Sequence, residues 1–470
     1  MNIRSYPIAS PLGGVFVAAC ILVLTGCANV NPLPDYERVR ELVANATVSA
    51  DLYIPGQSTN RGDSLKGPTG GMTRYDAIRI ALMNNKDLQS LMFEIGVSHS
   101  DVVQAGLLSN PSLNGVLRFS TSGGTSTFEA GILQGLFEVF RLPARHRIAK
   151  TNLERKIMEV ALGATNLAAE TSTAYIDALI AYKAEAVAAE NVMTARELLF
   201  VAKERLSAGV GTQLDINAAE AEAVEQDLQR QWADQNVKSA DLALSELMGV
   251  EQERGFFTAT LTNPIPPDVS HDLETLLELA EANRLDICAK RIQVEIARER
   301  LQLEKRTVIR ELSVGASVET TGERNEVGPA INIELPLFDQ NRAQIAKAEY
   351  RVSQAVAQLD SQRLAMRNEV RLALKQHEAA RDSLDLYERR LLPLRRESLS
   401  MAREAFNEGK TQLLFVIEYQ RQLLQTRIEY LSRLRTYLNS ISNIERAVGL
   451  SIHNINRHAN IGGCAFWNGC

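Results

Sequence analysis

Two kinds of hydrophobic pattern follow one another along this chain. Long stretches with apolar residues at helical spacing predict helices at about 74–108, 143–206, 215–248, 273–310, 342–407 and 415–448. Between them lie short runs in which apolar and polar residues alternate, at about 112–136 and 311–336. Alternation of period two is typical of a strand with one apolar and one polar face. The sequence therefore predicts a mainly α protein with a small β part.

The chain beyond residue 70 is an internal duplication. Asn84 and Asp87 in ALMNNKDL correspond to Asn283 and Asp286 in AEANRLDI, at an offset of 199 residues. QGLFEVFR near position 137 likewise corresponds to LPLFDQNR near position 338. Each repeat runs helix, pair of strands, very long helix, interruption and helix. We therefore place a first repeat at 71–265, a second repeat at 266–450 and a C-terminal tail at 451–470.

The predicted strands have the length and the alternation of a transmembrane barrel wall. LSVGASVE places Val314 and its apolar neighbours on one face, and Ser317 and Glu319 on the other. Four strands of about nine residues suit a wall with lipid outside and water inside, although two surface hairpins would explain the alternation equally well. Four strands cannot close such a barrel, and open edges are not tolerated in lipid. If the hairpins span a membrane, several copies of the chain must complete one barrel.

The very long helices predict packing on more than one side. Eleven alanines between positions 161 and 189 permit close helix approach, and the apolar residues are spread too widely for one narrow seam. A helix packed on both flanks, as in a ring of helices, has this pattern. Pro393 in the second long helix is expected to kink it or to mark a step in packing.

A short motif interrupts the helical pattern once in each repeat. Thr212-Gln213-Leu214 returns as Thr411-Gln412-Leu413, which predicts hairpin turns at about 207–214 and 407–414. Gly209, Gly211 and Gly409 favour a turn, and Thr212 and Thr411 are candidate caps of the returning helices.

The N-terminal residues predict export. The run GGVFVAACILVL is too short to span a membrane as a mature helix, and it ends in LTGC. Leu24 to Cys27 resembles the bacterial lipobox, which implies a signal peptide at 1–26 and acylation of Cys27. Ala28, rather than an aspartate, implies sorting to the outer membrane. An ordinary signal peptide with an incidental cysteine is the alternative. Residues 27–70 are expected to form a lipidated, extended segment.

Composition and motifs argue against several other classes of protein. The net charge is −6 and only 6 % of the residues are aromatic, with no basic stripe for nucleic acid. Gly409-Lys410-Thr411 is no phosphate loop, because Glu404 stands where its first glycine must be. No H-E-x-x-H or G-x-S-x-G motif occurs, so we expect no enzyme and no cofactor.

Cysteine and histidine spacing predicts no metal site. Cys288 is expected to be a small core residue, whereas Cys464 and Cys470 either form a disulfide or lie in a disordered tail. His453 and His458 match no standard zinc spacing.

The order of elements, the duplication, the N-x-x-D helix starts, NPSL at 110–113, LPLFDQNR at 335–342 and the G-x-T-Q-L interruptions together resemble the TolC-type outer-membrane efflux proteins. The resemblance covers about 70–450. It implies a homotrimer in which three chains share a 12-stranded transmembrane β-barrel and a trimeric α-helical barrel of long antiparallel coiled-coil helices. It also implies a passive exit duct served by a periplasmic adaptor and an inner-membrane pump.

The resemblance assigns roles to the two interruptions. They become hairpin tips that meet the adaptor, with Gly209, Gly211, Thr212, Gly409, Lys410 and Thr411 as docking residues. Glu418 falls on one acidic gate position of the family, Phe415 occupies the other, and Asp215 is the nearest carboxylate in the first hairpin. A lipoprotein adaptor and a coiled-coil envelope scaffold are the alternative functions. Metal ions, drugs and polypeptides all remain open as substrates.

Overall fold

The computed structural model describes residues 29–47, 49, 51–57, 71–119, 121, 123, 125–251, 269, 271–307, 312–321 and 324–457. They divide into two compact units, which we describe separately. The sheet unit contains Gly96–Lys150 and Arg310–Leu335, and the helical unit contains Leu33–Ile95, Thr151–Ile309 and Pro336–Cys470. The prediction of a mainly α chain with a small β part is confirmed.

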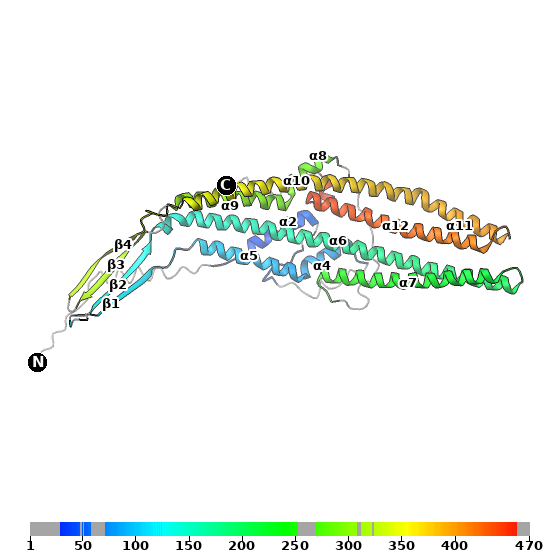
Figure 1. Ribbon diagram of the computed structural model, residues 1–470, viewed down its shortest axis with the longest axis horizontal. Helices are drawn as coiled ribbons and strands as arrows, with labels where there is room; N and C mark the ends of the chain where they lie inside the picture. The colour runs from blue at the N-terminus through cyan, green and yellow to red at the C-terminus, as the bar shows by residue number, and fades with distance from the viewer. Residues whose placement is uncertain are drawn as a thin grey trace. The chain divides into compact units, whose positions relative to one another are not determined.

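The helices and strands follow the same order in both repeats (Figure 1). The first repeat contains α4 (Arg74–Asn84), α5 (Lys86–Ala105), β1 (Ser112–Arg118), β2 (Thr127–Gly135), α6 (Phe137–Ser207) and α7 (Gln213–Met248). The second contains α8 (Leu273–Asn283), α9 (Leu285–Arg306), β3 (Leu312–Thr321), β4 (Arg324–Ile333), α10 (Arg342–Leu386), the π-helical turn η1 (Tyr387–Leu391), α11 (Leu392–Asn407) and α12 (Leu413–Val448). Two short helices flank the repeats, α2 (Leu33–Thr47) before them and α13 (Ile452–Asn456) after them.

The strands form one antiparallel sheet in the order β1-β2-β3-β4. The register places apolar residues of every strand on one face, so that Val314 lies opposite Ile331 and Ile132 opposite Leu113. That face carries Leu113, Leu117, Phe128, Ala130, Ile132, Val314, Ala316, Val318, Val327 and Ile331. The alternation predicted from sequence is therefore continuous across the sheet.

The opposite face of the sheet is polar and carries a row of carboxylates. Glu319 lies directly opposite Glu129 on one side and Glu326 on the other. Arg118 donates a hydrogen bond of 3.1 Å to Glu129, which offsets part of the charge. Like charges directly opposite one another in a sheet destabilise it. Repulsion between these carboxylates therefore lowers the stability of the sheet on its polar face.

Helix α6 packs on two sides within the helical unit. Tyr175 and Ala178 belong to a core cluster with residues of α4 and α7, including Leu244. Ile176 and Leu179 belong to a second cluster with residues of α10 and α12. The neighbouring positions 175 and 176 thus face different helices, which confirms the expectation that this helix is packed on both flanks.

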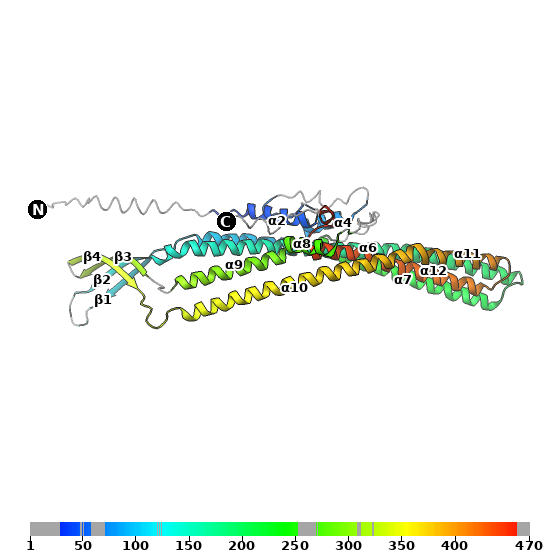
Figure 2. The same cartoon turned by 90° about the horizontal axis from the view of Figure 1, so that it is seen from above.

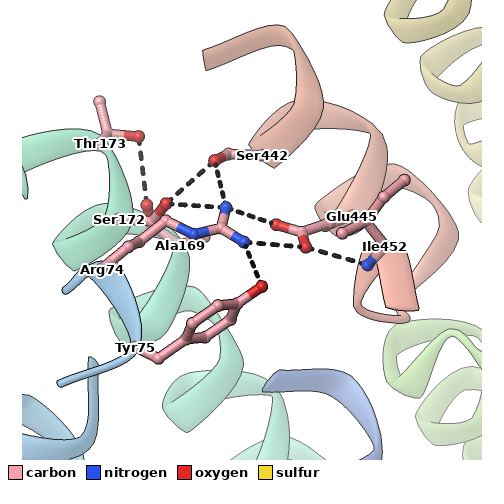
Figure 3. Close-up of polar contacts among 8 residues, drawn as sticks. All are labelled: Arg74, Tyr75, Ala169, Ser172, Thr173, Ser442, Glu445 and Ile452. Carbon is pink, nitrogen blue, oxygen red and sulfur yellow. Dashed lines mark hydrogen bonds and ion pairs between the residues drawn. The ribbon is translucent and has the colours of Figure 1, made fainter. Parts of the chain in front are cut away.

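A buried polar network ties the start of α4 to α6 and to the end of α12 (Figure 3). The Arg74 guanidinium donates to Glu445 at 3.0 and 3.3 Å and to Ser442 at 3.3 Å. Glu445 also accepts from the backbone N–H of Ile452, at 2.9 Å. Burial lowers the pKa of Arg74, but the charges of Glu445 and Tyr75 and the hydrogen bonds to them together raise it above its usual value. Because a buried ion pair costs several kcal/mol to desolvate, it persists only when its remaining hydrogen-bonding atoms are satisfied.

Several boundaries differ from the sequence predictions. The segment 27–70 contains the helix α2, whose Val39, Leu42 and Val43 are buried, so the expectation of an extended segment is wrong there. The helix predicted at 74–108 is broken at Asn85, and the helix predicted at 273–310 at Arg284. In both repeats the break lies inside the N-x-x-D motif. Helices α5 and α9 each begin one residue before the aspartate of that motif.

The helical geometry beside proline differs between the two long helices. Helix α6 begins at Phe137 rather than at Pro143, so Pro143 lies inside its second turn. In the second repeat the π-helical turn η1 immediately precedes α11, whose second residue is Pro393. A proline donates no backbone hydrogen bond and its ring clashes with the preceding turn, which a local widening of the helix relieves. A π-helical turn therefore lies beside Pro393, and the kink or step in packing expected there stays a prediction.

Cysteine usage partly corrects the sequence analysis. Cys288 is buried in α9, as expected, but it also takes part in a disulfide bond. Cys27, Cys464 and Cys470 lie outside the described residues, as does His458. The short helix α13, with Ile452 and Ile455 buried, occupies the start of the segment expected to be a tail.

Candidate functional site

The first interruption is a tight turn between α6 and α7. Gly209 has a φ of +75°, which only glycine adopts without strain, and a Cβ at Gly211 would lie 2.8 Å from the Leu206 backbone nitrogen. Thr212 caps α7: its side chain accepts from the Asp215 N–H, and Asp215 in turn accepts from the Thr212 N–H at 2.9 Å. This reciprocal pair is a capping box. It confirms Thr212 as a helix cap. The Asp215 carboxylate is bound to Thr212 of the same turn.

The second interruption joins α11 to α12 and differs in its cap. Gly409 has a φ of +74°, close to that of Gly209, and Lys410 pairs with Glu408 at 2.6 Å. The residue that caps α12 is Gln412, without a side-chain bond, so the expectation that Thr411 caps this helix is wrong. At the offset of 199, Leu414 stands where the first repeat has Asp215. A capping box needs a carboxylate or amide there, and leucine supplies none.

The two turns expose apolar side chains. Val210 and Leu214 are 64 % and 75 % exposed at the first turn, and Leu414 and Phe415 are 57 % and 53 % exposed at the second. Phe415 and Glu418 are both exposed and lie one helical turn apart on α12. The Glu418 carboxylate accepts a hydrogen bond of 2.7 Å from Gln422. Two of the predicted gate residues, Phe415 and Glu418, therefore share one exposed face of α12, whereas Asp215 lies on α7 of the other hairpin.

The two hairpins pack against each other near their turns. Leu399, Phe406, Val416 and Ile417 of the second hairpin share a core cluster with Ala202 and Ala219 of the first. The guanidinium of Arg205 lies 4.6 Å from the centre of the Phe406 ring, a distance typical of a cation–π contact.

Arginines of α12 connect the hairpins through ion pairs. The Arg421 guanidinium binds Glu222, whose side chain is only 3 % exposed, and reaches Glu225 at 2.9 Å. Its hydrogen bond to Glu222 is the main cause of a raised pKa of Arg421. Further along, Arg427 pairs with Glu190 at 3.0 Å and Arg435 with Asp177 at 2.6 Å.

Arg421 and Glu222 occupy equivalent positions, since 199 residues separate them. The sequence analysis missed this pair. The offset relates the two helices, but it does not reveal which of their faces meet.

The duplication, the open antiparallel sheet and the paired hairpins agree with one family of proteins. Residues 77–250 and 276–450, one stretch in each repeat, match the family model described as outer membrane efflux protein. The chain belongs to this family. It is thus an outer-membrane efflux channel protein, and the recognition made from sequence is confirmed.

Relatives of this efflux protein include two named for metal resistance. The cobalt-zinc-cadmium resistance protein CzcC of Cupriavidus metallidurans is 25 % identical over 390 residues, which cover 81 % of this chain and 90 % of CzcC. The nickel-cobalt-cadmium resistance protein NccC of Alcaligenes xylosoxydans is 29 % identical over 265 residues, 55 % of this chain and 56 % of NccC. The Campylobacter jejuni CmeC outer membrane channel, 16 % identical, shares the fold with a TM-score of 0.68 over 88 % of this chain and 98 % of CmeC.

Two features are absent from the described residues. No helix among them is both long and apolar enough to cross a membrane. No group of three or more His, Cys, Asp or Glu side chains in the described part of the efflux protein is placed to hold a metal ion.

A cavity of about 320 Å³ in the helical unit is lined by buried charges, but those charges are neutralised. Arg74 pairs with Glu445, and Arg284 pairs with Asp286 at 2.6 Å. Burial raises the pKa of Asp286, yet the charge and hydrogen bonds of Arg284, with further bonds from Ile287 and Gln362, together hold it below its usual value. Arg74 and Arg284 are therefore already paired within the chain.

We predict that Arg421→Gln destabilises the helical unit more than loss of an ordinary surface ion pair. The variant leaves the buried Glu222 without its cation, which should lower the free energy of unfolding by about 1 to 3 kcal/mol. Arg196→Gln, which breaks the exposed 2.9 Å pair with Asp227, is the matched control and should cost less than about 1 kcal/mol. Denaturant unfolding of the purified proteins measures both, and equal losses would contradict the role assigned to Arg421.

Proposed function

We propose that this protein is the passive exit duct of a tripartite efflux system, a homotrimer that acts with a periplasmic adaptor and an inner-membrane pump and catalyses no reaction. The register of the sheet carries the proposal. An apolar face shared by four strands suits contact with lipid, and a polar face suits a water-filled interior.

The open edges of the sheet support the trimer. In the order β1-β2-β3-β4, the outer edges of β1 and β4 have no partner strand among the described strands. Backbone groups left unpaired in lipid cost several kcal/mol each, so they need partners from other copies. Three copies supply twelve strands, which is an even number within the range of closed transmembrane barrels.

The N-terminal sequence supports a lipid anchor in the outer membrane. Cys27 follows Leu-Thr-Gly, the small-residue context of a lipobox, and Ala28 follows it. Acyl chains on Cys27 would contribute about 0.8 kcal/mol per buried methylene to anchoring. The sheet would hold the protein in the same membrane.

The turns between the hairpin helices are proposed as the contact with the adaptor. Gly209, Gly211 and Thr212 shape the first turn, and Gly409, Lys410 and Thr411 the second. Next to them, Val210, Leu214 and Leu414 expose apolar side chains that gain free energy when covered. Six such turns would surround the end of a trimeric tube.

The cargo is proposed to be divalent metal cations. CzcC and NccC are named for resistance to such metals. The row formed by Glu129, Glu319 and Glu326 would face the interior of the barrel, and rings of carboxylates favour cations in a pore. Glu418, repeated three times around an axis, would add a second acidic ring at the entrance.

A cell-based measurement tests the duct and its cargo together. In a strain that lacks this gene but keeps the pump and adaptor, the wild-type protein should restore tolerance to cobalt, zinc, cadmium or nickel. The same strain should show no change in tolerance to uncharged drugs. Restored drug tolerance without metal tolerance would reject the cargo, and failure to restore either would reject the duct.

The assignment of lipid and water faces predicts opposite effects of one substitution at two positions. Val314→Arg puts a charge on the apolar face, at a cost of about 2 to 4 kcal/mol near mid-bilayer, and should reduce trimer assembly. Ser317→Arg should assemble, because Ser317 lies on the polar face between Gly131 and Gly328, which leave room for a long side chain. Heat-resistant trimer on gels measures assembly, and equal tolerance of both variants would overturn the assignment.

The entrance predicts changes in single-channel recordings. Glu418→Gln should weaken cation preference and block by divalent ions, since it removes three carboxylates from the proposed ring. Phe415→Ala should raise the conductance of the closed state by removing an apolar side chain from the same face. Glu397→Gln, on α11 and away from the turn, serves as a charge-matched control. Unchanged selectivity and conductance in both gate variants would place the constriction elsewhere, with Asp215 the next candidate.

A further inference from the structure

Helices α9 and α10 lie side by side in the helical unit (Figure 1 and Figure 2). Side chains of both helices line a groove between them. Its volume is about 310 Å³. Alanines make the floor, since Ala297, Ala348 and Ala355 line the groove and are each no more than 6 % exposed. Small side chains at these positions leave the space open, and 310 Å³ is at the lower end of small-molecule sites.

The walls of the groove carry positive charge that the described residues leave unbalanced. Arg300 of α9 and Lys347 and Arg351 of α10 line it. Within the described part of the chain, no carboxylate lies within ion-pair distance of these three groups. Glu304 also lines the groove and offsets one of these charges, so a net positive charge remains; its carboxylate accepts a hydrogen bond of 2.9 Å from the Asn341 amide.

Three arginines that join helices of the helical unit are paired with carboxylates, unlike the cations of the groove. Arg74, Arg284 and Arg421 each have a carboxylate partner. The first repeat also differs, because the offset of 199 that relates α5 to α9 puts Asp101 at the position of Arg300. Pairing of the two helices therefore does not itself require a basic groove.

We propose that the groove between α9 and α10 binds a phosphate group. Guanidinium groups present planar pairs of N–H donors that match phosphate oxygens, and an ammonium adds a third charged donor. The glutamines that line the same walls, including Gln344 and Gln354, add neutral N–H donors. The phosphate belongs either to a small soluble molecule or to the headgroup of an anionic lipid.

The electrostatics of Arg300 agree with this geometry. Burial lowers the pKa of its guanidinium, and the positive charges of Arg351 and Arg155 lower it further. A bound dianion would neutralise that repulsion. Without the anion, the groove contains like charges whose removal should not harm the fold.

Binding is measured by titration calorimetry on the full-length trimer in detergent, with inorganic phosphate as one probe and short-chain phosphatidylglycerol as the other. The test variant is Arg300→Gln combined with Arg351→Gln. The control is Arg298→Gln combined with Lys305→Gln, which removes the same charge from surface pairs with Glu295 and Glu349 outside the groove. The measurement does not depend on conduction, so it stands apart from the proposed duct.

The wild type and the control should bind, and the test variant should bind at least about tenfold more weakly, as expected for loss of charged hydrogen bonds. Tighter binding of inorganic phosphate identifies a soluble ligand, and tighter binding of the phospholipid identifies a headgroup. The unliganded test variant should melt at or above the wild-type temperature. Absence of binding by either probe, or equal binding by the test variant, overturns the proposal. A lower melting temperature of the test variant also overturns it, because the arginines would then be pairing with carboxylates of a neighbouring copy.

Discussion

An open antiparallel sheet with one apolar face is the constraint on which the interpretation of this protein depends. Strands with unpaired edges are a liability in water and more so in lipid, where no solvent can satisfy the backbone. The chain carries four strands in linear order, and the register keeps their apolar residues on one face throughout. Such a sheet makes sense as one part of a closed wall. A single chain cannot close such a wall, so its function requires the assembly of several copies.

The helical unit is built from two copies of one helical hairpin. Each repeat contributes one hairpin, and the two hairpins meet through a shared apolar cluster and through arginines of α12. The equivalence of Arg421 and Glu222 shows how duplicated helices acquire different roles. If both repeats had kept the same residue there, like charges would face each other across the joint. Divergence at one position converts that repulsion into attraction, and the buried carboxylate of Glu222 makes the pairing specific.

Most helices and strands of this fold could be predicted from two patterns in the sequence, the periodicity of apolar residues and the internal repeat. Strand faces follow directly from alternation, as in LSVGASVE, and the hairpin turns follow from glycine and from the repeated Thr-Gln-Leu. The helix α2 was not predicted, although Tyr36, Val39 and Val43 recur at helical spacing, because the whole segment 27–70 was assigned as an extended connection to the lipid anchor. The cap of α12 was misjudged at Thr411 because a shared motif hides a local change, Leu414 in place of Asp215. Ion pairs between helices, such as Arg74 with Glu445, depend on which faces meet, and a single sequence does not encode that in any local pattern.

Charges that a fold pairs and charges that it leaves unpaired have different consequences. The arginines that join the hairpins are neutralised, so they stabilise one arrangement and attract no solute. Glu319, by contrast, lies between Glu129 and Glu326, and Arg300 lies near Arg351 and Arg155. Each arrangement costs stability that a mixed pair would recover. Proteins keep such local costs where function requires them. In a passive duct, which has no catalytic step to drive, the field of unpaired charges is the main means by which the wall can distinguish one ion from another. The sign of the charge at each level would then decide which solutes linger there, with cations favoured along the polar face of the sheet and anions in the groove beside α10.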